Sequence, residues 1–373
     1  MQAITTRSQR FSPVLILAIG LILYGCAFAI LLRNRSFEPA GAIVVLVLFG
    51  GVFPLLAWAG TLRAVPLSIS IRSSASALIA LTGYVILLSH YLIAGPQWID
   101  QHLPHSWVDS VQIKFFIGLA KKLAVFVVIP FAIFRFGFGY RGRDFGIQRE
   151  GLRALLGSHL PVVLVVGGAF LCFQYFVSSG GAAFRREHFT AFQLFVGLPL
   201  CFVWLFVEAG LVEEFFFRGL VQSHFAAAFK SEVSGVVLMS LIFGLAHAPG
   251  FIFRHAGEVE GLGSNPSAID AIAYSIVVLA VSGITFGIIW ARTKNLFALM
   301  LIHACRRPAA EFWHVRPNVV LTQDGTCLLP RHSRCRFAIG QMSDSHAGEH
   351  RGIFADERGQ LRMRGFELFN GLF

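Results

Sequence analysis

Apolar stretches about as long as a bilayer is thick recur along most of this chain and limit what it can fold into. A hydrocarbon core of about 30 Å is crossed by about 20 helical residues, and a helix satisfies its own backbone polar groups there. Hydrophobic residues make up 55% of the 373 residues and charged residues only 14%, against roughly 25% in a soluble domain. We therefore predict an all-α polytopic membrane helical bundle of about eight transmembrane helices. The predicted spans are Pro13–Leu32, Gly41–Leu62, Ala75–Gly95, Phe115–Phe134, His159–Val177, Ala191–Val212, Val233–Ala248 and Ala271–Ala291.

The formal net charge of +11 fits a membrane protein, because cytoplasmic loops collect Lys and Arg. With the N-terminus in the cytoplasm, the arginines between the fourth and fifth predicted spans all fall in one cytoplasmic loop. They are Arg135, Arg141, Arg143, Arg149 and Arg153. We therefore expect an integral protein of the plasma (inner) membrane with a cytoplasmic N-terminus. Aromatic and basic residues do not interleave as they do in grooves for single-stranded nucleic acid, so nucleic acid is not an expected partner.

The character of the chain changes after Cys305. An apolar helix is predicted to begin at Leu296, but Arg306, Arg307 and Pro308 interrupt it after ten residues. The predicted domains are accordingly 1–190, N-terminal transmembrane helices; 191–305, a catalytic core; and 306–373, an atypical soluble or disordered tail. The tail can be a solvated extension, a disordered segment or the product of an out-of-frame reading, and the change in mid-helix favours the last.

Ionisable residues inside apolar spans are costly, so each one is a candidate for function. The densest group is Glu213, Glu214 and Arg218 in the stretch LVEEFFFRG. Glu214 and Arg218 lie four residues apart on one helical face and can pair, whereas Glu213 points about 100° away. An interfacial charge cluster at a helix end is the alternative. Lys121 and Lys122 are also intramembrane, and must snorkel, face a cavity or shift the fourth span.

Two histidines lie in apolar helices further along the chain. His247 follows Phe243 by four residues in FGLAH, and His303 lies in LMLIHAC. A lone histidine on an apolar helix is usually a hydrogen-bonded packing residue. Together with the acidic pair, however, they supply what peptide hydrolysis needs: a base to activate water and donors to stabilise the tetrahedral oxyanion.

These residues resemble the motifs of the CAAX protease and bacteriocin-processing (CPBP) family of intramembrane glutamic endopeptidases, the CAAX prenyl protease and lysostaphin-resistance type. The motif EExxxR is matched by Glu213, Glu214 and Arg218, and the motif FxxxH by Phe243 and His247. The third motif is a histidine followed four residues later by Asn or Asp; His303 matches it, but Arg307 stands at the fourth position. The resemblance covers roughly residues 191–305.

The resemblance implies that Glu213 activates water with help from His247, while Glu214 and Arg218 hold the geometry and His303 contributes to the oxyanion site. A guanidinium at position 307 cannot accept hydrogen bonds as an Asn side chain does. The function predicted is therefore hydrolysis of a peptide bond near the bilayer. The alternatives are a catalytically impaired family member acting as a membrane immunity, binding or scaffold protein, and a small proton-coupled transporter.

No metal or other cofactor is expected. His346, Glu349 and His350 spell HxxEH, but Gly348 lies inside the motif and the surroundings have no amphipathic pattern, so we interpret the match as chance. The expected partners are a peptide or protein substrate at the membrane and the lipid bilayer. A prenylated protein, a bacteriocin leader and other peptides all remain open as substrates.

The depth of Glu213 raises a difficulty. Successive spans place Glu213 near one end of its helix and His247 near the opposite side of the membrane, yet the two should share a site. Residues 191–229 are too many for one span, so we expect a break at Gly197, Pro199 or Gly210 that lets the glutamates lie deeper.

Overall fold

The computed structural model describes residues 13–71, 74–104, 107, 111–186, 189–252, 261–262, 266–306, 354–355 and 361–362. In this part of the chain the protein is a bundle of helices, and the one sheet is an antiparallel pair of two-residue strands, β1 (Phe354–Ala355) and β2 (Leu361–Arg362). Among the described residues, seven helices are long and apolar enough to cross a membrane, and a bent helix pair can supply an eighth. The predicted all-α polytopic fold is confirmed.

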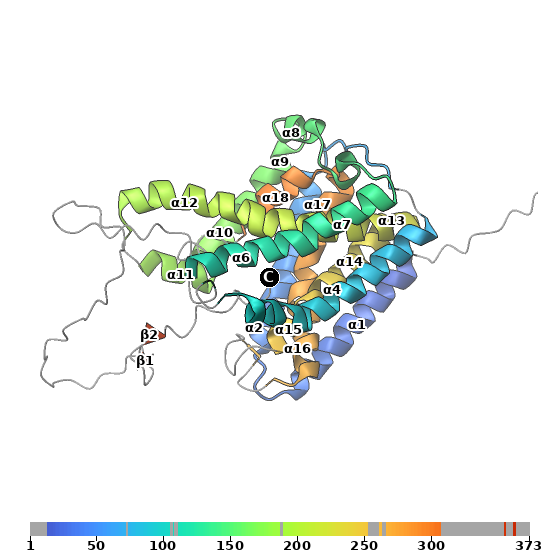
Figure 1. Ribbon diagram of the computed structural model, residues 1–373. Coiled ribbons are helices and arrows are strands. Elements are labelled where there is room, and N and C mark those ends of the chain that lie inside the picture. Colours follow the sequence, from blue (N-terminus) through green and yellow to red (C-terminus); the bar gives the residue numbers. More distant parts are fainter. Residues whose placement is uncertain are drawn as a thin grey trace, which may run out of the picture.

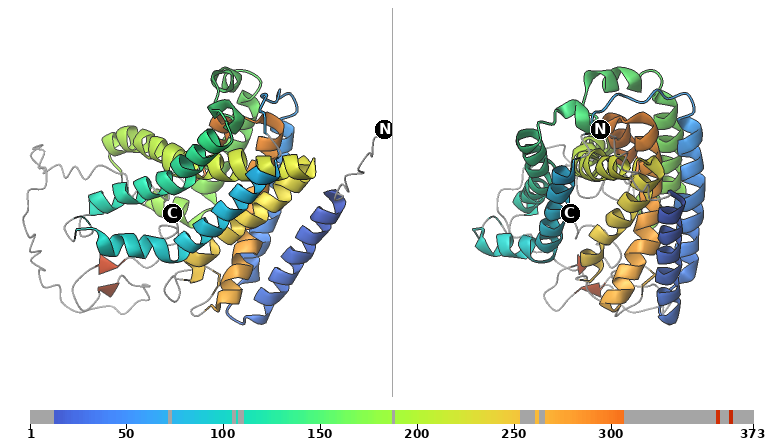
Figure 2. Two further views of the ribbon diagram at one scale, coloured as in Figure 1. Left: turned by 45° about the vertical axis from the view of Figure 1, so that its right-hand side comes forward. Right: turned by 90° about the vertical axis from the view of Figure 1, so that its right-hand side faces the viewer.

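The first half of the chain forms the outer helices of the bundle. In the right-hand view of Figure 2, α4 and α6 lie on one side and α1 with α2 and α3 on the other. The helical segments are α1 (Pro13–Arg33), α2 (Pro39–Val47), η1 (Leu48–Val52), α3 (Phe53–Gly60), α4 (Ala75–His102), α6 (Val111–Leu123), η2 (Ala124–Val128), α7 (Ile129–Ala132), η3 (Ile133–Gly137), η4 (Gly142–Phe145) and α8 (Arg149–Leu155).

The chain turns by 90° between the segments Gly142–Leu155 and Leu160–Phe176, and His159 lies at this corner. The later segments carry the predicted site residues. They are α9 (Leu160–Val162), η5 (Val163–Gly167), α10 (Gly168–Phe176), α11 (Ser179–Arg186), α12 (Ala191–Leu205), η6 (Phe206–Leu211), η7 (Glu214–Gln222), α13 (Ser223–Phe229), α14 (Glu232–Ala246), α15 (Ala248–Ile252), α16 (Ala268–Tyr274), η8 (Ser275–Ala280), α17 (Val281–Thr293) and α18 (Leu296–Ala304).

The expected break after Ala191 is wrong. The chain is helical from Ala191 to Phe229, 39 residues in one run, with Pro199 inside α12. The run contains two π-helical segments, η6 and η7, whose i→i+5 hydrogen bonds place more residues in each turn than an α-helix has. It crosses the molecule from α12 to α13 (Figure 1), and Glu213 lies near the middle of this run.

Two similar turns join the helices of the core. Lys230, between α13 and α14, and Lys294, between α17 and α18, both have the left-handed backbone that ends a helix, with φ of 51° and 50°. The next residue caps the following helix: the Ser231 hydroxyl accepts from the Ser234 N–H, and the Asn295 side chain from the N–H groups of α18. Lys294 Nζ lies 2.7 Å from Glu232 Oε1 at the start of α14, which ties the two turns together.

Small residues let the core helices approach closely, as is usual in membranes. A Cβ atom on Gly283 of α17 would lie 3.1 Å from Ser240 Oγ of α14. A Cβ atom on Gly244 would lie 2.7 Å from the Ser275 carbonyl oxygen and 2.8 Å from Ala280 Cβ. The end of α14, just before His247, is therefore held against η8 at backbone distance.

Gly244→Ala is expected to lower the free energy of unfolding by about 1–3 kcal/mol, because the backbone at Ser275 cannot move aside cheaply. Thermal unfolding in detergent measures the effect. Gly83→Ala is the matched control, since a Cβ atom there meets nothing within 4 Å on exposed α4. An equal shift in both variants would contradict close packing at Gly244.

Candidate active site

The predicted acidic motif lies on η7, inside the membrane-spanning run. Glu213 directly precedes η7, and Glu214 and Arg218 are its first and fifth residues. The wide turns leave a carbonyl at Arg218 that accepts from Ser223 Oγ at 3.1 Å, and Trp290 Nε1 of α17 donates to the same hydroxyl at 3.0 Å. π-Helical turns are frequent at functional sites because they redirect side chains.

Glu214 connects Arg218 of its own helix with His303 of α18. Its Oε2 lies 3.2 Å from Arg218 Nε, and its Oε1 lies 2.6 Å from His303 Nδ1 on α18. Because a carboxylate oxygen accepts, His303 Nδ1 is the donor of this bond. The side chains of Glu214 and Arg218 have no exposed surface. The buried Glu214 side chain thus links η7 to α18.

Glu213 is the more accessible of the two carboxylates, with 13% of its side chain exposed. Its Oε2 lies 3.7 Å from His303 Nε2, and it also interacts electrostatically with His247. His303 therefore lies between the two glutamates, bonded to Glu214 and facing Glu213. The structure brings Glu213, Glu214, Arg218 and His303 into direct contact. His247 lies close enough to Glu213 for an electrostatic interaction.

His247 follows the last residue of α14, and its ring is fixed by its own helix. The Nδ1 atom lies 2.7 Å from the Phe243 carbonyl oxygen, which can only accept, so Nδ1 donates. In the neutral ring, Nε2 is then the nitrogen that can take up a proton. The four-residue spacing of FxxxH is what places the Phe243 carbonyl within reach.

Aromatic rings hold the Arg218 guanidinium. Its Cζ lies 4.7 Å from the ring centroid of Phe243 and 5.2 Å from that of Phe286 on α17. Phe286 also packs against His303, with ring centroids 5.0 Å apart. The nitrogens Nη1 and Nη2 of Arg218 have no hydrogen-bond partner among the described residues. Cation–π contacts therefore replace hydrogen bonds on this guanidinium.

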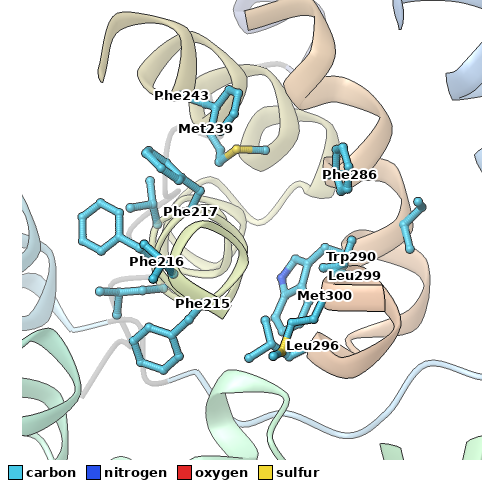
Figure 3. Packing of buried hydrophobic residues seen from close by; sticks show 14 of the residues in the cluster. Phe215, Phe216, Phe217, Met239, Phe243, Phe286, Trp290, Leu296, Leu299 and Met300 are labelled. Carbon is cyan, nitrogen blue, oxygen red and sulfur yellow. The ribbon is translucent and has the colours of Figure 1, made fainter. Parts of the chain in front are cut away.

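The remaining sides of η7 are sealed by apolar residues. Figure 3 looks along η7 and shows Phe215, Phe216 and Phe217 projecting on one side, with Phe286 and Trp290 of α17 on the other. Phe215, Phe216 and Phe217 are buried. Charges in so apolar a setting interact more strongly than they would in water.

Arg306 adds a cation next to the site. Its Nη2 lies 3.4 Å from Ser282 Oγ, its Cζ lies 5.7 Å from the ring centroid of Phe49, and it interacts electrostatically with Glu213 and Glu214. Arg307, the departure from the third motif, lies outside the described residues, as do His346, Glu349 and His350.

A second intramembrane ion pair explains one of the two lysines. Lys122 Nζ on α6 pairs with Glu208 Oε1 on η6, and both side chains are mostly buried. Lys122 thus has an acidic partner on another helix of the bundle. Glu208 was not singled out from the sequence, although a carboxylate inside an apolar run was the signal that could have found it.

A family model for Rce1-like type II CAAX prenyl endopeptidases matches residues 195–306. The resemblance to the CAAX protease family is confirmed for this segment. The CAAX-type segment contains the first two motifs and His303, whereas position 307 lies just beyond it, and its family consists of proteases. No curated protein and no solved structure matches the chain.

One feature of the CAAX-type segment, the position of Phe286, was not predicted. Phe286 stacks on both Arg218 and His303, but one phenylalanine among 38 carries no signal in the sequence. Groups of three or more His, Cys, Asp or Glu side chains arranged to hold a metal ion are absent from the described residues.

Proposed function

We propose that the chain is an intramembrane endopeptidase that hydrolyses a peptide bond near the bilayer by glutamate-activated water. The observation that carries this proposal is the convergence of Glu213, Glu214 and His303 from η7 and α18 inside a membrane-spanning bundle. One carboxylate is buried and contacts Arg218 and His303, whereas the other is partly exposed and faces a histidine. This division suits one structural and one catalytic glutamate.

In the proposed reaction, Glu213 takes a proton from a water molecule as the water oxygen attacks the carbonyl carbon of the scissile bond. The carbonyl π electrons move to oxygen, and the resulting oxyanion is stabilised by His303, whose Nδ1 is held by Glu214. Glu213 then passes the proton to the leaving nitrogen as the C–N bond breaks. His247 holds the water on the Glu213 side, and Arg218 fixes Glu214.

The proposed substrate is a peptide or protein segment at the membrane, and no cofactor takes part. Apolar helices make the chain an integral membrane protein, and we propose the plasma (inner) membrane with a cytoplasmic N-terminus. The second candidate function is a catalytically impaired family member that binds a partner. Arg306 beside both glutamates and Arg307 in place of an amide favour it.

Hydrolysis in ¹⁸O-labelled water tests the proposal. Full-length protein in liposomes is incubated with membrane-anchored peptides, some prenylated and some not, and the products are analysed by mass spectrometry. We expect one ¹⁸O atom in each new carboxyl group and no loss of cleavage after treatment with EDTA, because the proposed reaction uses no metal ion. Absence of cleavage across the panel, with retained peptide binding, would overturn the proposal in favour of the impaired member.

A further inference from the structure

Asn295 fixes the start of the helix that carries His303. Its side chain is fully buried, and its Oδ1 accepts from the N–H groups of Phe297 at 3.1 Å and Ala298 at 3.4 Å. These bonds satisfy donors in the first turn of α18 and assign the orientation of the amide. His303 lies eight residues further on, about 12 Å along the helix axis.

The other end of the Asn295 amide holds two segments distant in sequence. Nδ2 donates to the Gly151 carbonyl oxygen of α8 at 2.9 Å and to His159 Nδ1 at 2.9 Å. Because an amide NH₂ group can only donate, His159 Nδ1 is the acceptor. The ring proton is therefore on Nε2, which donates to the Val65 carbonyl oxygen at 2.9 Å. The network thus requires neutral His159 in one tautomer.

His159 occupies a position where three parts of the chain meet. It lies at the 90° corner between α8 and α9, bonds the segment that follows α3 through Val65, and bonds the α17–α18 turn through Asn295. Leu67 N–H also donates to the Thr293 carbonyl oxygen at 2.9 Å. The histidine is fully buried, so its bonds do not compete with water.

We propose that His159 is a positioning residue that acts through Asn295 to set the start of α18, and thereby the place of His303 beside Glu213 and Glu214. The catalytic consequence rests on the proposed function, whereas the placement of α18 does not. Nothing in the reaction touches His159 itself. His159 accepts from the Asn295 amide, and that amide caps the first turn of α18.

The network also predicts whether its stabilising effect increases or decreases with pH. The groups that face His159 are neutral, namely the Asn295 amide and the Val65 carbonyl, and the charged residues of adjacent α8, Arg149, Glu150 and Arg153, make no electrostatic interaction with it in the described part of the chain. A proton on His159 Nδ1 would remove the acceptor of the bond from Asn295 Nδ2. Because the unfolded chain takes up this proton without losing a bond, the stabilisation is lost as the pH falls below about 6.5, the ordinary pKa of histidine.

A disulfide probe measures the placement of α18 without using catalysis. A Cβ atom on Gly167 of η5 would lie 3.9 Å from Cys305 Cβ and 3.4 Å from its Sγ. A Cβ–Cβ distance of about 3.5–4.5 Å suits a disulfide. Gly167→Cys, in the full chain with Cys305 as the only native cysteine, should therefore crosslink on mild oxidation, as read by peptide mass spectrometry.

His159→Leu is expected to slow this crosslink at least about tenfold, because it supplies neither acceptor nor donor. His159→Gln carries both and should crosslink within about twofold of the parent. Asn295→Ser is a second route if His159→Leu does not fold, since it keeps a cap but loses the NH₂ group, and it should slow crosslinking equally. His90→Leu on exposed α4 is the matched control. Unchanged crosslinking in both His159→Leu and Asn295→Ser would overturn the proposal.

Peptide cleavage separates positioning from mere stability. His159→Leu should lower kcat with KM little changed, and His159→Gln should keep neutral-pH activity while losing the acid limb that the parent shows as His159 protonates. An identical acid limb in His159→Gln would contradict the role of His159 protonation. If the parent cleaves nothing but crosslinking still depends on His159, the proposed function fails and the positioning role stands.

Discussion

Glu213→Gln is expected to reduce kcat by about 10²- to 10⁴-fold, the usual contribution of a general base. Glutamine has nearly the same shape as glutamate but cannot take a proton from water, so the fold and the contact with His303 should be retained. The measurement is cleavage of a membrane-anchored peptide by the purified full-length variant in liposomes. Because the proposed role is confined to the transition state, KM should change much less than kcat.

Glu150→Gln is the matched control for this experiment. Glu150 is exposed on α8, and its substitution removes one negative charge away from the site. Its kcat should equal that of the parent. Retention of more than about a tenth of the parent kcat in folded Glu213→Gln would remove Glu213 from the role of base. The same result would leave the fold and the family match untouched.

Arg218→Leu is expected to lower the free energy of unfolding by about 3–5 kcal/mol, because it leaves the buried Glu214 charge without its ion-pair partner. The loss also removes the guanidinium from between Phe243 and Phe286. Unfolding in detergent, followed by circular dichroism, measures the change. A large effect is expected here because neither side chain of the pair has any exposed surface.

The double variant Glu214→Leu with Arg218→Leu shows whether charge is the cause. With no uncompensated charge left in the apolar site, it should be more stable than Arg218→Leu alone, although His303 loses its acceptor. Arg218→Lys, which keeps the charge but lacks a planar group to stack, should fall between the parent and Arg218→Leu. A double variant less stable than both single variants would assign the effect to packing instead.

The number and approximate bounds of the spans could be predicted from the sequence, because a lipid-facing helix must be apolar over its whole crossing. The end of the sixth span could not. Val212 precedes two glutamates and an arginine, which reads as the edge of a membrane, whereas in the structure their charges are paired within the bundle and the helix continues to Phe229. Pairing between distant helices is invisible to a hydropathy pattern.

Contacts within one helix could be predicted through spacing: Glu214 with Arg218, and Phe243 with His247, are each four residues apart and meet. Contacts between helices needed the structure. Examples are the bond from His303 to Glu214, the stacking of Phe286 and the pair between Lys122 and Glu208. Each joins segments tens of residues apart, and no local period encodes which helices become neighbours.

The helical run from Ala191 to Phe229 is longer than a bilayer is thick. At about 1.5 Å per residue, its 39 residues extend about 58 Å, nearly twice the hydrocarbon thickness of a bilayer. Such a helix must incline steeply or emerge into the headgroups, and exposed Phe192 and Phe195 near its beginning favour contact with lipid. A thinner or thicker bilayer leaves a different length of the run outside the hydrocarbon. Under the proposed function, this difference shifts Glu213 relative to a membrane-anchored peptide, and lipid composition would then help to select which bond is cut.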